Sequence, residues 1–357
     1  MRYLFVSTPV GPLGSGIGGG VELNVTNLAY QLLQDGQDVC IVAPEGSVIP
    51  GIAHTTVGGL PPQFAQSQQR DVPVTLPLPS SLANMWDAAR QLAPKFDIVV
   101  NWAYDWLPFY LTPFFDRPIA HIVSMGSLNT GLDEAIASVR QQFPGTVAVH
   151  SRAQANTFPE VPGSPFHILP CGIDPTRYDF VPNPAEYLAW IGRIAPEKGL
   201  EDAAALSQQL GQPVVVLGKM QDLDYWESIQ REYPQAQLDY RGFLPTDKLQ
   251  AVVGQARALL VTPKWVEAFG MVVVEAMACG VPAIAYNRGG PAEIIESGRT
   301  GWVVECDRVD ALVDAVGQIE TIERHTCRQR VEQHFSLTAM KTNFQSWAEA
   351  ILERAGN

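Results

Sequence analysis

Positive charge is scarce in this chain. Lysine and arginine together number 24 against 37 aspartates and glutamates, which gives a formal net charge of −13 at pH 7. Nucleic acids and anionic membranes both attract proteins through a basic surface field. The composition therefore argues against a nucleic-acid partner and against stable membrane association, while one focused phosphate site stays compatible with it.

Cysteine motifs and uninterrupted apolar runs are also missing. The cysteines are scattered, and none forms a CxxC pair or a zinc spacing: Cys40, Cys171, Cys279, Cys306 and Cys327. The apolar stretch 271–286 is broken by Glu275, Gly280 and Pro282, and the run 3–7 is too short for a signal-peptide core. We therefore expect reduced thiols in a cytoplasmic protein.

What the chain does contain is an alternation of short apolar runs with longer helical patterns. The runs expected as strands are 3–7, 39–43, 98–101, 119–124, 147–150, 166–169, 187–191, 214–217, 259–262, 283–286 and 302–304. One apolar helix face is expected in each half, from Val21, Val25, Leu28 and Leu32 and from Ala203, Leu206 and Leu210. This alternation is typical of α/β domains with parallel sheets covered by helices on both faces.

The length of 357 residues suits about two domains. A proline-rich stretch without periodicity marks the break between them, and a fresh strand follows it. We expect a first domain at 1–174, a linker at 175–186, a second domain at 187–335 and a closing helix at 336–357.

A glycine-rich loop, residues 11–20, lies between the first expected strand and the first expected helix. Glycines let a backbone approach a ligand closely and aim its amides at an anion. Gly14, Gly16 and Gly19 spell GxGxxG, but this loop is longer than a Rossmann turn. A flexible connector and a nicotinamide site remain alternatives to a phosphate-binding loop.

The segment 190–199 places two cations between a strand and a helix. Arg193 and Lys198 stand between Gly192 and Gly199, beside the expected helix N-terminus. Such an end favours anions, and guanidinium and ammonium groups bind them strongly. A diphosphate site is the functional interpretation, and a pair of solvated surface charges is the alternative.

Two glutamates eight positions apart occur in the segment 267–280. On one continuous helix they would lie about 12 Å apart along the axis and could not converge on one atom. If a helix begins at Gly270, Glu267 lies in the preceding loop and Glu275 in the early helix. The first amides of that helix would then face an anion, with a carboxylate on each side to accept sugar hydroxyls. Two ordinary helix charges are the alternative, but Glu275 interrupts an otherwise apolar run.

Taken together, these segments resemble the retaining glycosyltransferases of family four, which have the GT-B architecture of two doubly wound Rossmann-like domains facing a central cleft. In the first half the resemblance rests on Gly19, Gly20, Glu22, Leu28, Ala29, Leu32, Gly36 and Val39. In the second half it rests on the segments 192–199, 241–244 and 267–275 and on the glycine pattern of 289–301. The spaced combination covers nearly the whole chain.

The resemblance implies roles for individual residues. Arg193 and Lys198 would hold the donor diphosphate, and Glu267 would bind hydroxyls of the donor sugar; these are the expected catalytic residues. The other residues expected at the donor are Gly19, Gly20, Gly218, Lys219, Leu244, Phe269, Gly270, Met271, Val272 and, for the ribose, Glu275. No catalytic metal and no other cofactor is expected.

Two further patterns bear on this assignment. The family places a histidine at the end of the strand expected here at 119–124, where Ser124 stands; His121 lies mid-strand, and a core histidine is its alternative. The pair Asp222 and Asp224 spells DxD, a metal-binding pattern elsewhere, but here the two carboxylates open a helix, which the helix dipole favours.

The acidic composition favours a small soluble acceptor for the sugar. On the acceptor side we place Gly16, Trp102, Trp106, His121 and Ser124; the aromatic pair could stack on a flat ring, or could pack inside as a helix start. The segment 5–23 also resembles the cyanobacterial pterin glucosyltransferases, which imply UDP-glucose as donor and tetrahydrobiopterin as acceptor. A family-four enzyme with another soluble acceptor, a nucleotide-sugar epimerase, an NAD-dependent oxidoreductase and a non-catalytic sugar-nucleotide sensor stay open.

Overall fold

The computed structural model describes residues 1–15, 19–63 and 69–356 of the chain. They form two compact units, Met1–Gly172 with Leu337–Asn357 and Ile173–Ser336. The stretch expected as a linker thus belongs to the second unit, where the amide of Val181 donates to the carbonyl of Cys279 (3.1 Å).

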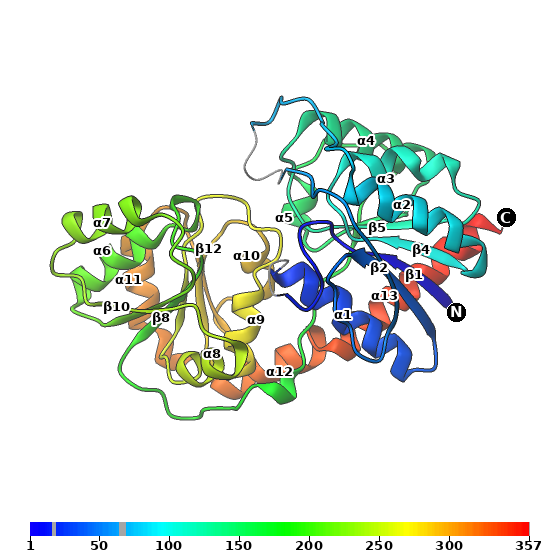
Figure 1. Cartoon of the computed structure of the whole chain (residues 1–357). Helices are drawn as coiled ribbons and strands as arrows, with labels where there is room; N and C mark the ends of the chain where they lie inside the picture. Colours follow the sequence, from blue (N-terminus) through cyan, green and yellow to red (C-terminus); the bar gives the residue numbers. More distant parts are fainter. Residues whose placement is uncertain (16–18, 64–68, 357) are drawn as a thin grey trace. The chain divides into compact units, whose positions relative to one another are not determined.

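The first unit is built on a parallel sheet of order β3-β2-β1-β4-β5-β6-β7. Its strands are β1 (Arg2–Val6), β2 (Asp38–Pro44), β3 (Ala53–Val57), β4 (Ile98–Asn101), β5 (Ile119–Val123), β6 (Val147–Val149) and β7 (His167–Ile168). Its helices are α1 (Gly19–Gln34), α2 (Ser81–Leu92), α3 (Trp106–Leu111), α4 (Thr130–Gln142), α5 (Arg152–Ala155) and α13 (Leu337–Ala355), with short 3-10 turns η2 (Ala93–Lys95) and η3 (Thr112–Phe114). Figure 1 shows α13, in red, beside α1, in blue.

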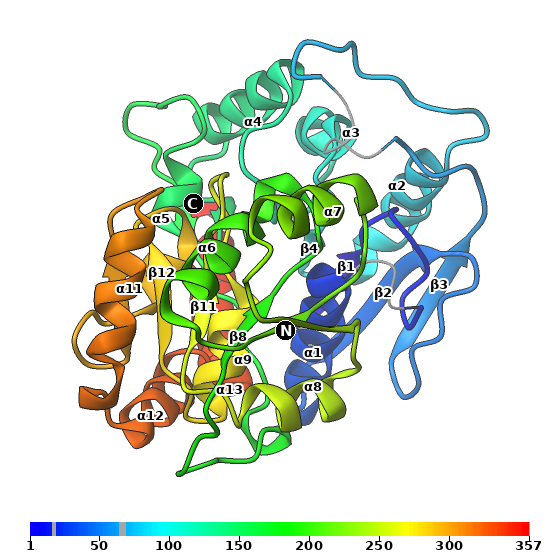
Figure 2. The same cartoon turned by 90° about the vertical axis from the view of Figure 1, so that its left-hand side faces the viewer.

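The second unit has a parallel sheet of order β10-β9-β8-β11-β12-β13. Its strands are β8 (Leu188–Ile191), β9 (Val214–Leu217), β10 (Leu238–Gly242), β11 (Leu259–Val261), β12 (Ala283–Tyr286) and β13 (Gly301–Val304). Its helices are α6 (Leu200–Leu210), α7 (Leu223–Glu232), α8 (Thr246–Val253), α9 (Met271–Ala278), α10 (Gly290–Ile294), α11 (Val309–Gly317) and α12 (Arg324–His334), with 3-10 turns η4 (Pro175–Arg177), η5 (Pro196–Lys198) and η6 (Ile319–Thr321). Helices α6 and α11 pack together, as Figure 2 shows.

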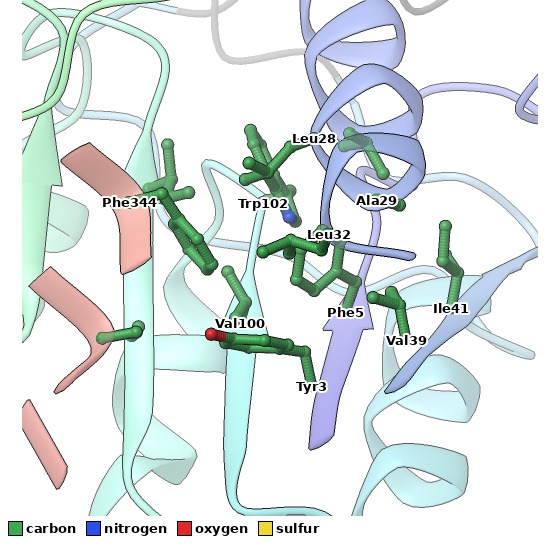
Figure 3. Close-up of a cluster of buried hydrophobic side chains, with 14 of the residues drawn as sticks. Tyr3, Phe5, Leu28, Ala29, Leu32, Val39, Ile41, Val100, Trp102 and Phe344 are labelled. Carbon is green, nitrogen blue, oxygen red and sulfur yellow. The ribbon is translucent and has the colours of Figure 1, made fainter. Parts of the chain in front are cut away.

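The apolar periodicity of α1 determines which face enters the core of the first unit. Leu28 and Leu32 are fully buried over Tyr3 and Phe5 of β1, and Phe344 of α13 completes the cluster (Figure 3). The expected face of α6 is confirmed at Ala203 and Leu206, whereas Leu210, at the last residue of the helix, is 42% exposed.

Two of the four edge strands in the described sheets, β3 and β10, do not appear among the expected strands. Their sequences, AHTTV and LDYRG, are largely polar and their side chains are half-buried or exposed. An edge strand with this composition shows no continuous apolar run, which was the signal that identified the central strands.

His121 lies in the core of the first unit, with no exposed surface. Its Nδ1 lies 3.2 Å from Nδ2 of Asn101, its Nε2 lies 3.0 Å from Oγ1 of Thr112, and its ring stacks on Phe109 at 4.4 Å. Burial lowers the pKa of His121 from 6.5 to about 3. The acceptor-side assignment of His121 is therefore corrected: it is a core histidine of β5 that contacts the last residue of β4 and the turn η3.

This burial predicts an acid-sensitive contribution to stability. The folded state keeps His121 neutral, while the unfolded chain takes up the proton below pH 6.5, so stability falls as pH drops from 6.5 toward 3. Unfolding of His121→Gln should take up one proton fewer than unfolding of the wild type. We therefore expect the unfolding free energy of the variant to depend less steeply on pH, by about 1.4 kcal/mol per pH unit between about pH 4 and 6. Urea unfolding across this range measures it; equal slopes in the variant and the wild type would contradict the neutral buried state.

Candidate active site

Chemistry-bearing loops gather at one edge of the second sheet. Strands β8, β11 and β12 are neighbours and run parallel, so the segments that follow them meet at the carboxyl ends of the strands. These are the turn 196–199, the loop 262–270 and the segment 287–290. Ligands of open parallel sheets bind at this edge.

Lys198 and Glu267 form the central contact of this edge. Nζ of Lys198 lies 2.8 Å from both carboxylate oxygens of Glu267, and the two side chains are 16% and 23% exposed. The indole of Trp265 donates to Oε2 of the same carboxylate (3.3 Å) and lies 5.2 Å from the ammonium, ring centroid to Nζ. A cation and a carboxylate are thus held together, partly shielded from water.

Backbone contacts hold the two loops that carry this pair against each other. Gly199 has a φ of 67°, and a Cβ there would lie 1.9 Å from the carbonyl oxygen of Thr262. The hydroxyl of Thr262 donates to the carbonyl of Gly199 (2.7 Å) and accepts from the indole of Trp190 (3.1 Å). The amide of Lys264 donates to the carbonyl of Glu197 (2.9 Å). Only glycine permits this approach, which fixes the position of the neighbouring Lys198.

Helix α9 begins directly after the loop 262–270, which carries Glu267 and is called the glutamate loop from here on. A helix start at Gly270 was expected from the sequence. Gly270 is the N-cap residue, with a φ of 106° and no side-chain cap hydrogen bond. Met271 and Val272 are the first two residues of the helix. The first amides of a helix have no partner within it, and the dipole makes this end positive. Phe269, just before it, is buried against Phe335. The amides at the start of α9, which are suited to bind an anion, therefore follow directly after the loop that carries Glu267.

Glu275 lies in the second turn of α9, as the interpretation of the two glutamates requires. One of its oxygens accepts a hydrogen bond from the hydroxyl of Tyr178 (3.1 Å). Burial raises the pKa of Glu275 to about 7, and the hydrogen bond from Tyr178 opposes that rise. The carboxyl group can therefore change its charge near neutral pH.

Arg193 lies on the β9 side of this edge. Its guanidinium binds Oε1 of Gln221 (2.6 Å) and Glu197 (2.8 Å) rather than a residue of the glutamate loop. Gly218 follows β9 with a φ of 141°, and a Cβ there would lie 1.8 Å from the carbonyl oxygen of Gly192. The structure thus brings Gly218 and Arg193 onto neighbouring segments. Lys219 beside them is exposed, and Leu244, after β10, is half-buried.

The acceptor-side residues of the first unit do not share one environment. Trp102 is 3% exposed and packs on Phe5 (5.8 Å between ring centroids; Figure 3), so its assignment to a binding surface is corrected to the core. Trp106 is half-buried and stacks on Tyr110 at 4.5 Å. Ser124 follows β5 directly and is half-buried.

The glycine loop is only partly described. Gly19 and Gly20 open α1 and are exposed, whereas Gly16 lies outside the described residues. Glu22, in the first turn of α1, accepts from the amide of Gly14 (2.5 Å) and so fixes the start of this loop.

The DxD pattern has a structural explanation. Asp222 is the N-cap of α7, and its carboxylate accepts from the amide of Tyr225 (2.9 Å). Within the ranges that the structure describes, no group of three or more His, Cys, Asp or Glu side chains is arranged to hold a metal ion.

Four residues at these edges were not singled out from the sequence. Thr262 and Trp265 lie in the loop 262–270, Tyr178 lies in the proline-rich stretch, and Asp105 follows β4 in the first unit. The only signal for the first two was their place between a central strand and Glu267.

The chain is similar to known glycosyltransferases, most clearly in its second half. Residues 180–334 match the family model described as glycosyl transferases group 1. Sucrose synthase of Solanum tuberosum is 47% identical over 58 residues, which is 16% of this chain but only 7% of that protein. D-inositol 3-phosphate glycosyltransferase of Nocardia farcinica is 25% identical over 367 residues, covering 88% of this chain and 79% of that protein.

The fold is shared with solved structures, among them AviGT4, a glycosyltransferase involved in avilamycin A biosynthesis, which aligns over 99% of this chain and 98% of its own with a TM-score of 0.69, at 19% sequence identity. Anabaena HepE in complex with UDP-glucose aligns over 98% of this chain and 99% of its own with a TM-score of 0.74, at 17% sequence identity. In the part of the chain that the structure covers, no helix is long and apolar enough to cross a membrane. Residues 180–334 are therefore similar to the group 1 glycosyl transferases, and the chain as a whole has the GT-B fold.

Proposed function

We propose that this protein transfers glucose from UDP-glucose to a hydroxyl of a small soluble acceptor, tetrahydrobiopterin or a related pterin, with retention of the anomeric configuration. The observation that carries the proposal is the Lys198–Glu267 pair beside the N-terminus of α9. The group 1 match of residues 180–334 and the UDP-glucose bound by the structural neighbour HepE support the donor.

The geometry suits a sugar diphosphate. An ammonium group has three N–H donors, and two carboxylate oxygens of Glu267 lie within reach of Nζ of Lys198. The remaining donor is available for a phosphate oxygen, and the amides of α9 add to it. The oxygens of Glu267 accept hydroxyl groups of the hexose, because a carboxylate can accept several hydrogen bonds.

The reaction breaks the bond between the anomeric carbon and the diphosphate oxygen and forms a bond from that carbon to the acceptor oxygen. Negative charge develops on the departing diphosphate, and preorganised donors at that position lower the barrier most. The proton of the acceptor hydroxyl passes to the departing phosphate on the same face of the sugar, which gives retention without a covalent intermediate. Lys198, Arg193 and the α9 amides supply the positive charge in this proposal, so no catalytic metal is needed.

For the acceptor we propose Asp105 as a binding residue. Sheet order changes direction between β1 and β4, and ligands bind at the carboxyl ends of strands beside such a point. Asp105 follows β4, is half-buried and makes no ion pair among the described residues; burial raises its pKa to about 6, against the effect of the Trp106 and Leu107 amides. An ionised carboxylate there can accept the two adjacent N–H groups of a 2-amino-4-oxo pterin ring.

Asp105→Asn is accordingly expected to raise the KM for the pterin about tenfold or more and to leave the KM for UDP-glucose unchanged, since a hydrogen bond to a charged group contributes about 1.5–3 kcal/mol. Steady-state kinetics with each substrate varied separately measures this. Asp116→Asn, at an exposed aspartate of the same unit, is the matched control. An unchanged pterin KM in Asp105→Asn would rule out this contact.

The proposed activity is tested by mass spectrometry of the products after incubation with several nucleotide sugars and a panel of acceptors that includes pterins. We expect UDP and a glucosylated pterin. A glycoside of another acceptor would keep the transferase and overturn the pterin. An epimerised sugar nucleotide, nicotinamide binding, or donor binding without turnover would instead identify an epimerase, an oxidoreductase or a sensor.

A further inference from the structure

The hydrogen bond between Tyr178 and Glu275 joins the start of the second unit to helix α9. The hydroxyl of Tyr178 donates to Oε1 of Glu275 at 3.1 Å. Tyr178 is 6% exposed, so water does not compete freely for either group. The contact spans 97 positions of sequence, and no sequence motif of the donor site includes the tyrosine.

The backbone around Tyr178 is held independently of its hydroxyl. Its amide donates to the carbonyl of Pro175 (3.1 Å), which closes the turn η4. The guanidinium of Arg328, on α12, donates both to the carbonyl of Tyr178 (2.7 Å) and to the carbonyl of Ala278, the last residue of α9 (2.6 Å). Arg328 therefore fixes the distance between Tyr178 and the helix that carries Glu275.

We propose that Tyr178 is a positioning residue for nucleotide binding: its hydroxyl occupies one oxygen of Glu275, orients the carboxylate, and keeps it in the ionised form that accepts the ribose hydroxyls. This inference rests on the proposed function, because it assigns a partner to the residue expected at the ribose. It adds a group that does not itself touch the nucleotide.

The surroundings of Glu275 explain why such a partner matters. Burial disfavours the charged carboxylate and raises its pKa to about 7, while the hydrogen bond from Tyr178 lowers it. The other titratable or charged groups close to this pair are Arg177 and Asp179 beside Tyr178, Cys279 directly after α9, and Arg324 and Arg328 on α12. A protonated carboxyl presents a donor in place of an acceptor, so nucleotide affinity rises as the pH increases through the pKa of Glu275.

The test uses UDP alone, titrated by calorimetry into the full chain between about pH 5.5 and 8.5, a window that brackets the shifted carboxyl. In Tyr178→Phe we expect UDP to bind about tenfold more weakly at pH 7, the size of one hydrogen bond to a charged group. The midpoint of the pH dependence should move upward, and the affinities should converge with those of the wild type at the alkaline end. Glu275→Gln should bind UDP weakly at every pH, and adding Tyr178→Phe to it should change nothing further.

Tyr187→Phe is the matched control, because that hydroxyl donates only to a backbone carbonyl, that of Val252 (2.7 Å), in the same unit. It should keep the wild-type pH profile. A loss of affinity in Tyr178→Phe that is equal at every pH, or one that adds fully to Glu275→Gln, would show a purely structural role and overturn the inference. If the wild type binds no UDP at any pH, the proposed donor itself is wrong; if it binds UDP and Tyr178→Phe is indistinguishable from it, only the role of Tyr178 falls.

Discussion

Lys198→Met is expected to lower the turnover of glucose transfer by about 10²- to 10³-fold, the usual cost of removing one preorganised donor at a developing negative charge. The side chain keeps its length but loses the ammonium that lies 2.8 Å from Glu267. Two effects combine, because the departing diphosphate loses a cation and Glu267 loses the contact that orients it. Quenched-flow or steady-state measurement of UDP release gives the value.

The matched control for this substitution is Lys341→Met. Lys341 also pairs with a carboxylate, Asp35 at 2.5 Å, and its side chain is 13% exposed, but it lies on α13 in the first unit. Both variants lose one ion pair, so a similar change in thermal stability is expected for the two, with turnover lost only in Lys198→Met. Near-normal turnover in Lys198→Met would remove the diphosphate role from this residue.

Gly290→Ala is expected to disturb the site through packing alone. A Cβ at this position would lie 2.3 Å from the carbonyl oxygen of Phe269 and 2.5 Å from its Cα, and backbone atoms cannot move aside cheaply. The amide of Gly290 also donates to the carbonyl of Glu267 (2.8 Å), so the added methyl group would push α10 away from the glutamate loop. We expect the free energy of unfolding to fall by about 1–3 kcal/mol and turnover to fall by about 10²-fold, as for a 1 Å displacement of a positioning group.

Gly317→Ala provides the comparison, because this glycine ends α11 and a Cβ added there would meet no atom within 4 Å. Its unfolding free energy should stay within about 0.5 kcal/mol of the wild type, with unchanged turnover. Urea unfolding measures the free energy of unfolding of both variants, and UDP-release kinetics measures their turnover. If Gly290→Ala were as stable and as active as Gly317→Ala, the close contact between α10 and the glutamate loop would not control the site.

The central strands and the helix faces could be predicted because burial on both sides leaves continuous apolar runs and a 3.6-residue period. The packing of α13 against Tyr3 and Phe5 could not, since an apolar face does not specify its partner. For Trp102 and His121 the sequence left a core position and a binding position equally open. Burial decided both, because polar or aromatic residues at the end of a strand occur in either setting.

At the candidate site the loops that meet could be predicted from the sequence. Lys198 and Glu267 are 69 positions apart, yet both follow neighbouring parallel strands, so their meeting is a consequence of sheet order. The contacts of Trp265 and Tyr178 are different. Each depends on the path of a loop without periodicity, and no spacing rule places such side chains.

The return of α13 to the first unit has a consequence for the order of events during synthesis. Residues of α13, among them Phe344 and Trp347, complete the core around Tyr3 and Phe5, although the whole of Ile173–Ser336 lies between them in the chain. At about 5–20 residues per second, a ribosome needs on the order of 10–30 s to make that intervening unit. For this interval the nascent first unit exposes the apolar surface that α13 later covers, at a stage when the second unit can already be folding.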